Sequence, residues 1–393
     1  MSSHLGSDGA AYKSSPIAKL HLPVNILYCL AINTHFSCHA KTSASVMDTD
    51  KCASGSCTAP PQTREEKRKA FDHADMTAAE ICDGLRNDLH RIGMDYLSDH
   101  DLSRVETDVH DVWDELIHAA KIIPSVDAEH DRLVTLILEL RELGNIMRRN
   151  KDAGAEEAAV LSNGQRPWAD LPFLAEELNA FWTNESRTLT VSERQSLAVM
   201  SGKLCGAGVR AAEIAQAALW LFKEVLETDR PRAPSSAEDQ VSQQPDLTAA
   251  DLLPACLEWL KYGKCKLAKL SLDNHRPALS KEDAALASPG PLAVAAGIKD
   301  EGFSLARWLF WRQRLGELYR GGGEQVAKPA RACFEQMVNA GMSMSVNIPG
   351  ERRFLDKAFE ALDKELAARE FKGSVGIEEI EIDPTWAIGN GPN

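Results

Sequence analysis

Apolar residues recur three and four positions apart through most of the chain after Thr63. One such stripe links Ile81, Leu85, Leu89 and Ile92, and this spacing places all four side chains on one face of a helix. Similar stripes follow along the chain, with few alternating segments between them. The pattern predicts an all-α fold, an irregular multihelical bundle.

Capping residues and prolines set the expected ends of these helices. Asp101 can cap the helix around Trp113, and Pro124 ends it. Ser192, with a glutamine three residues later, fits a capping box, and Thr248 can cap another helix. Three glycines in the helix after Ser192 predict a kink or close helix packing: Gly202, Gly206 and Gly208. Further helices are expected over 126–149, 304–320, 324–340 and 350–371.

The organisation of the chain follows from where this periodicity fails. Residues 1–63 are rich in Ser, Ala and Thr, which predicts a disordered arm or a misannotated extension, with Met47 as an alternative start. A helical domain is expected over 64–372, and a three-helix lobe is one arrangement for its N-terminal part. The expected subdivisions are lobes over 64–150 and 166–372, flexible loops over 229–246 and 273–290, and an acidic tail over 373–393.

Composition narrows the function classes. The 393 residues are 44% hydrophobic and 26% charged, with a formal net charge of −14. Because phosphate binding needs a basic surface, general nucleic-acid binding is not expected. No apolar run approaches the roughly 20 residues of a membrane-spanning helix, so no membrane role is expected. The nine cysteines are too few for a disulfide framework in so long a chain, which favours a cytoplasmic or nuclear protein.

One predicted helix carries a group of candidate metal ligands. His110, Asp114 and His118 are spaced by four residues and therefore share a helix face. Two imidazoles and a carboxylate are plausible ligands for a first-row metal. The alternative is a solvated polar face opposite the apolar stripe through Trp113. A metal-dependent hydrolase is the corresponding functional hypothesis, although no cofactor is predicted.

A second candidate is the helix expected over 304–320, which alternates aromatic and basic side chains. Exposed aromatic and arginine side chains could grip an acidic partner or an anionic ligand. Alternatively, this is a core helix whose arginines lie over aromatic rings or pair with acidic residues. The candidate surface comprises Arg307, Trp308, Trp311, Arg312 and Arg314.

Several short motifs of the chain are similar to those of a known protein family. Trp113 is followed by Ala119-Ala120, then come Trp168-Ala-Asp-Leu-Pro172 and Glu193-Arg194. With Trp259-Leu260 and Arg307-Trp308, the chain resembles a family of fungal proteins of unknown function over roughly 76–340. The resemblance implies an all-helical fold and no established catalytic residues.

The functional prediction rests on what these patterns favour. The chain lacks a Gly-x-Ser-x-Gly elbow, a His-Glu-x-x-His helix and a dinucleotide-binding fingerprint. The sequence therefore favours a non-catalytic interaction or accessory protein of a regulatory or biosynthetic pathway, acting through an unidentified protein partner. The alternatives are the metal-dependent hydrolase and a helical protein that binds a small molecule.

Overall fold

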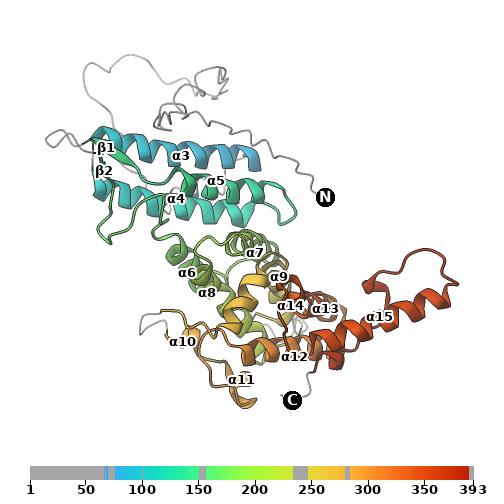
Figure 1. The fold of residues 1–393 in the computed structure, drawn as a ribbon. Helices are drawn as coiled ribbons and strands as arrows, with labels where there is room; N and C mark the ends of the chain where they lie inside the picture. The colour runs from blue at the N-terminus through green and yellow to red at the C-terminus, as the bar shows by residue number, and fades with distance from the viewer. Residues whose placement is uncertain are drawn as a thin grey trace, which may run out of the picture. The chain divides into compact units, whose positions relative to one another are not determined.

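The structure is a computed structural model, and it describes residues 66, 68, 69, 76–99, 101–149, 156–232, 247–278 and 284–388. The predicted N-terminal arm up to residue 63 lies outside the described residues, as does most of the loop predicted over 229–246. The described chain is dominated by helices (Figure 1). The all-α prediction is confirmed.

In the part of the chain that the structure describes, ten longer helices form the body: α3 (Ala78–Asp99), α4 (Leu102–Ile122), α5 (Glu129–Leu143), α6 (Leu174–Asn184), α7 (Val191–Gly206), α8 (Ala211–Phe222), α9 (Ala249–Leu272), α12 (Leu305–Gly321), α13 (Glu324–Val338) and α15 (Glu351–Ala368). Shorter elements join them: β1 (Met147–Arg149), β2 (Glu156–Ala158), the π-helix η1 (Lys223–Glu227), α10 (Ala284–Ala287), α11 (Pro291–Ala295), α14 (Ala340–Met344) and the 3₁₀ helices η2 (Ile377–Glu379) and η3 (Pro384–Ala387).

Local side-chain chemistry fixes most helix starts. Asp101 accepts hydrogen bonds from two backbone N–H groups at the start of α4, and Thr248 forms a capping box with Asp251 at α9, as the sequence predicts. The expected cap at Ser192 is wrong. Thr190 caps α7 instead, because a glutamate lies three residues after it and completes the capping box.

The helix expected over 126–149 is shorter than predicted. Gly144, with φ of +74°, ends α5, because glycine adopts this left-handed backbone conformation without a steric penalty. The following residues pair as a small antiparallel ribbon, with Met147 opposite Ala158. Helix α5 packs against α3 and α4, and both α4 and α5 also contact α7.

Helices α7 and α9 lie against each other at the centre of the fold (Figure 1). Their close approach requires two glycines. A Cβ at Gly202 would lie 3.2 Å from the Glu258 carbonyl oxygen, and one at Gly206 would lie 2.3 Å from the Tyr262 carbonyl oxygen. The close packing predicted from these glycines is confirmed. Around this pair, five tryptophans are almost fully buried: Trp113, Trp182, Trp259, Trp308 and Trp311.

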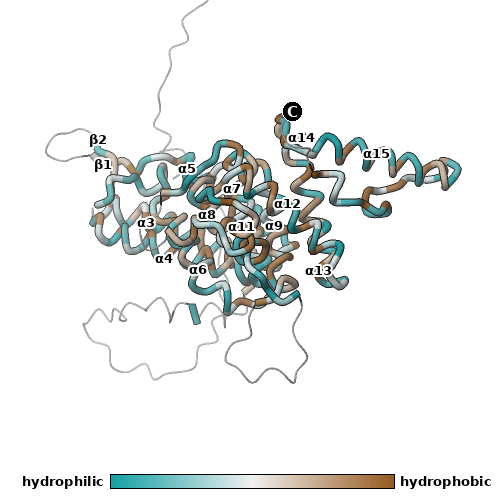
Figure 2. The backbone as a smooth tube through the Cα atoms, turned by 90° about the horizontal axis from the view of Figure 1, so that it is seen from below, coloured by the Kyte–Doolittle hydropathy of each residue, from teal (hydrophilic) through white to brown (hydrophobic). Residues whose placement is uncertain are grey.

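Helix α15 extends away from α12 and α13 in both views (Figures 1 and 2). The chain after α15 is acidic, as its composition indicates, but residues 377–388 pack against helices rather than trail away from them. The segment packs there because it buries three apolar side chains, Ile380, Ile382 and Ala387. Of the described residues, no helix is long and apolar enough to cross a membrane.

Candidate functional site

The structure gives His110, Asp114 and His118 separate surroundings along α4. His110 stacks on Phe173 with ring centroids 4.0 Å apart, and its Nδ1 lies 2.6 Å from a carboxylate oxygen of Glu177. His118 is buried and meets Phe181 edge to face. The side chains share a face, but each one contacts a different neighbour.

Asp114 is buried and holds a guanidinium. Arg68, from the chain before α3, donates to both carboxylate oxygens, with Nε lying 2.9 Å from Oδ2. This ion pair raises the pKa of Arg68 well above its usual range. Within the described residues, no three His, Cys, Asp or Glu side chains are grouped closely enough to hold a metal ion. The arrangement therefore favours an ion pair at Asp114.

The predicted partner surface on α12 is corrected by its burial. Arg307, Trp308 and Trp311 are fully buried, and Arg312 is 4% exposed. Arg314 is half-buried and pairs with Glu317 on the same helix. Arg307, Trp308, Trp311 and Arg312 therefore face the core and do not present a surface to a partner.

A buried carboxylate explains why Arg307 and Trp311 of α12 lie inside. The carboxylate of Glu227, the last residue of η1, accepts hydrogen bonds from Nε and Nη2 of Arg307 at 2.8 and 2.9 Å. The Trp311 indole N–H donates to the same carboxylate at 2.6 Å, and the Gly290 N–H donates to it at 2.5 Å. Charge and hydrogen bonds are thus satisfied within the core, which is what burial of a carboxylate requires.

The remaining guanidinium N–H groups of Arg307 also find acceptors. Its Nη1 donates to the carbonyl oxygens of Ala287 and Gly302, at 2.8 and 2.6 Å. Lys223, at the start of η1, donates to the Ala285 carbonyl, and burial lowers the pKa of its ammonium. The network therefore ties η1, α12 and the loop around α10 and α11 together.

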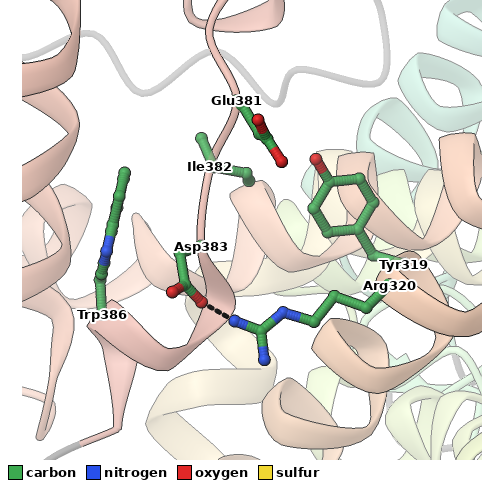
Figure 3. A pocket seen from close by; sticks show the side chains of 6 residues that line it. All are labelled: Tyr319, Arg320, Glu381, Ile382, Asp383 and Trp386. Atoms are coloured by element: carbon green, nitrogen blue, oxygen red, sulfur yellow. Dashed lines mark hydrogen bonds and ion pairs between the residues drawn. The ribbon is translucent and has the colours of Figure 1, made fainter.

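A pocket lies where the last turn of α12 meets the C-terminal segment, and its volume is about 500 Å³. Figure 3 shows Tyr319 and Arg320, from α12, opposite Glu381 and Asp383, from the segment before η3. Ile382 and Trp386 complete the lining. Arg320 and Asp383 form an ion pair. Sequence reasoning missed this pocket, because its two walls are about 60 residues apart and nothing in the pattern pairs them.

A second exposed feature is the outer face of α15. Phe359 is 61% exposed, and Phe371, which follows the helix, is 75% exposed. Phe371 and Glu370 before it both have positive φ, of 58° and 55°. A non-glycine residue in this conformation is strained by roughly 1–3 kcal/mol, and such strain is concentrated at functional segments.

Comparison with known proteins identifies the family of this chain. Residues 113–315, from within α4 to within α12, match the family described as protein of unknown function DUF3632. The chain belongs to this family. It is also 29% identical over 277 residues to the oxopyrrolidines biosynthesis cluster protein G of Penicillium oxalicum, covering 67% of this chain and 72% of that relative. These findings confirm the resemblance to fungal proteins of unknown function. No solved structure matches the chain.

Proposed function

We propose that this DUF3632 protein is a non-catalytic accessory protein of a fungal biosynthetic pathway and that it acts by docking a partner protein on α15. The pathway context is supported by the Penicillium relative, whose name places it in a biosynthesis cluster. The docking role is supported by one observation above the others, the apolar stripe on the projecting helix.

The stripe comprises Leu355, Phe359, Leu362 and Leu366, at spacings of four, three and four residues. This spacing is that of a helix that packs against a second helix along one seam. Leu355 and Leu362 are partly buried against the hydrophobic core, whereas Phe359 projects into solvent. An exposed aromatic beside half-buried leucines is a suitable anchor for a partner.

The charges beside the stripe indicate the kind of partner. Asp356 and Asp363 lie three residues before and four residues after Phe359, on one edge of the stripe, and both are exposed. A second copy of α15 in parallel register would bring carboxylates against carboxylates, which is unfavourable. A partner helix with an apolar stripe and basic flanks fits both the shape and the charge.

The experiment compares how much of each pathway enzyme is captured by the wild-type chain and by a variant that lacks the Phe359 ring. Wild-type chain, Phe359→Ser and the control Val294→Ser are each used as bait. Val294 on α11 is similarly exposed, at 56%, but lies outside the stripe. We expect Phe359→Ser to lose the pathway partner and Val294→Ser to retain it.

Two results would contradict this function. The first is a partner retained by Phe359→Ser. The second is a wild-type dimer, measured by light scattering, that Phe359→Ser converts to a monomer, since that would make the stripe a contact between copies. Cross-links from Lys357 or Lys364 on α15 to lysines of the partner would locate the contact independently.

The proposed site of action is the cytoplasm or nucleus. The described cysteines are free thiols, and four of them are buried. Burial raises the pKa of Cys82 and Cys205 to about 12, so both stay protonated at neutral pH. Free buried thiols are typical of proteins in a reducing compartment, which supports this localisation.

A further inference from the structure

The pocket between α12 and the C-terminal segment has the size of a small-molecule site. Its volume of about 500 Å³ is in the range of pockets that hold small ligands. Ile382 lines it but is only 3% exposed, so its apolar lining comes mainly from the rings of Tyr319 and Trp386. The charges that line it decide what kind of ligand fits.

The positive charge of the arginine in the pocket is already offset by a neighbouring carboxylate. Arg320 and Asp383 form an ion pair across the pocket wall, so their charges offset each other (Figure 3). Glu381 is exposed and, among the residues that the structure describes, pairs with no Lys or Arg. Its carboxylate points into the same space as the Tyr319 ring (Figure 3). The pocket therefore has one carboxylate in excess.

Two further features favour a positive ligand. Tyr319 and Arg320 lie in the last turn of α12, where the helix dipole is negative. The aromatic faces also attract cations, and the Tyr319 ring already has the Arg331 guanidinium 5.7 Å from its centre. Arg331 does not oppose a second cation strongly, because Glu335 accepts its Nε–H at 2.8 Å.

We propose that this pocket binds a small organic ammonium ion, an amine with a short aromatic or apolar body. The ammonium group lies at Glu381, and the apolar body packs between the rings of Tyr319 and Trp386. The alternative ligand is an organic carboxylate that binds Arg320. This ligand is less favourable, because it would have to displace Asp383 from its ion pair with Arg320.

Three probes with the same phenyl group separate these ligands: 2-phenylethylammonium, 2-phenylethanol and phenylacetate. Each is titrated calorimetrically into the full chain. We expect the ammonium ion to bind about tenfold more tightly than the alcohol and phenylacetate to bind most weakly. Phenylacetate as the tightest ligand, or no binding of any probe at millimolar concentration, would overturn the proposal.

Two pairs of variants test the residues. Glu381→Gln removes the excess carboxylate and is expected to weaken ammonium binding about tenfold, whereas Glu378→Gln, outside the lining, leaves it unchanged. Arg320→Met frees Asp383 for the ligand and is expected to strengthen ammonium binding several-fold, whereas Arg314→Met has no effect. An anion site would respond to Arg320→Met in the opposite sense. Ammonium binding that is unaffected by Glu381→Gln would also overturn the proposal.

Discussion

Helices α12 and α15 are similar in length, 17 and 18 residues, and both carry arginines and aromatic side chains. Their environments are opposite. Trp308 and Trp311 on α12 are fully buried, whereas Phe359 on α15 is largely exposed. The composition of α12 resembles that of a binding surface, yet α15 is the helix that presents apolar groups to solvent. Side-chain chemistry alone thus does not locate an interaction surface.

The two helices differ in whether their charged side chains have buried hydrogen-bonding partners. Arg307 on α12 meets the Glu227 carboxylate and two backbone carbonyls, so its charge is tolerated in the core. The acidic residues beside Phe359, Asp356 and Asp363, have no such buried partner among the described residues and remain in water. Helix α15 is therefore held mainly by its inner face, where Phe354 packs on Phe334 and Trp386.

The largest effect is expected when the charge match beneath α12 is broken. Arg307→Met leaves Glu227 as a buried carboxylate without a cation, and it should lower the free energy of unfolding by about 3–5 kcal/mol. Urea denaturation followed by circular dichroism measures this loss. Arg314→Met on the same helix is the control and should cost less than about 1 kcal/mol, because the Arg314–Glu317 pair is on the surface.

A double variant separates charge from packing. If the carboxylate is the cause, Glu227→Leu combined with Arg307→Met should be less destabilising than Arg307→Met alone, since no charge stays buried unpaired. A loss of less than 1 kcal/mol for Arg307→Met would contradict the account of α12 as a helix buried through its charge partner.

The sequence predicted the features that depend on near neighbours. Helical stripes and the caps Asp101 and Thr248 are local, and the glycines of α7 marked its close contact with α9 correctly. The burial of α12 depends on Glu227, which lies 80 residues before Arg307. The spacing of residues along the chain does not pair this glutamate with Arg307, so the choice between core and surface could not be made from the pattern alone.

The candidate sites were predictable to a smaller extent. The shared face of His110, Asp114 and His118 followed from their spacing, but the Arg68 guanidinium at Asp114 comes from a segment 46 residues earlier. The pocket at Arg320 needs a C-terminal segment that folds back onto α12, and the two isoleucines buried in that segment, Ile380 and Ile382, were a weak signal for this. Contacts between distant segments thus account for most of what the sequence left open.

The second prediction concerns the junction of the two helices, where Glu351 begins α15 near Arg312 of α12. Burial raises the pKa of Glu351 to about 7, although the Gly341 N–H and the charge of Arg312 lower it part of the way. Burial likewise lowers the pKa of Arg312 to about 10. The folded state therefore favours the neutral carboxyl. Its stabilising contribution is complete below the unfolded pKa of 4.5 and is lost as pH rises through 7.

Glu351→Gln keeps the neutral form at every pH and isolates this contribution. Between pH 4.5 and 8, the wild type should lose about 3 kcal/mol of stability relative to the variant. Thermal unfolding of both proteins across this range gives the difference, and other carboxylates cancel because both proteins contain them. A difference that does not change with pH would show that folding does not raise the pKa of Glu351.

A smaller effect is expected where α12 supports the C-terminal segment. A Cβ at Gly316 would lie 2.5 Å from the Cβ of Pro384, which is the first residue of η3. Gly316→Ala should therefore destabilise the protein by about 1–3 kcal/mol through overpacking, despite the better helix propensity of alanine. Gly84→Ala on α3 is the control, since a Cβ there meets no atom within 4 Å, and it should stabilise slightly. Equal effects of the two variants would contradict the close contact between α12 and η3.

The smallest effect on stability is expected on the outer face of α15. Phe359→Ser removes a side chain that is 61% exposed, so the free energy of unfolding should change by no more than about 0.5 kcal/mol. Phe354→Ser is the matched variant on the inner face of the same helix, where the ring is fully buried, and it should cost about 3–5 kcal/mol. Urea denaturation of both variants measures the two sides of one helix under the same conditions. If Phe359→Ser were as destabilising as Phe354→Ser, the outer ring would belong to the core of this chain, and α15 would no longer differ from α12 in the way that the docking proposal requires.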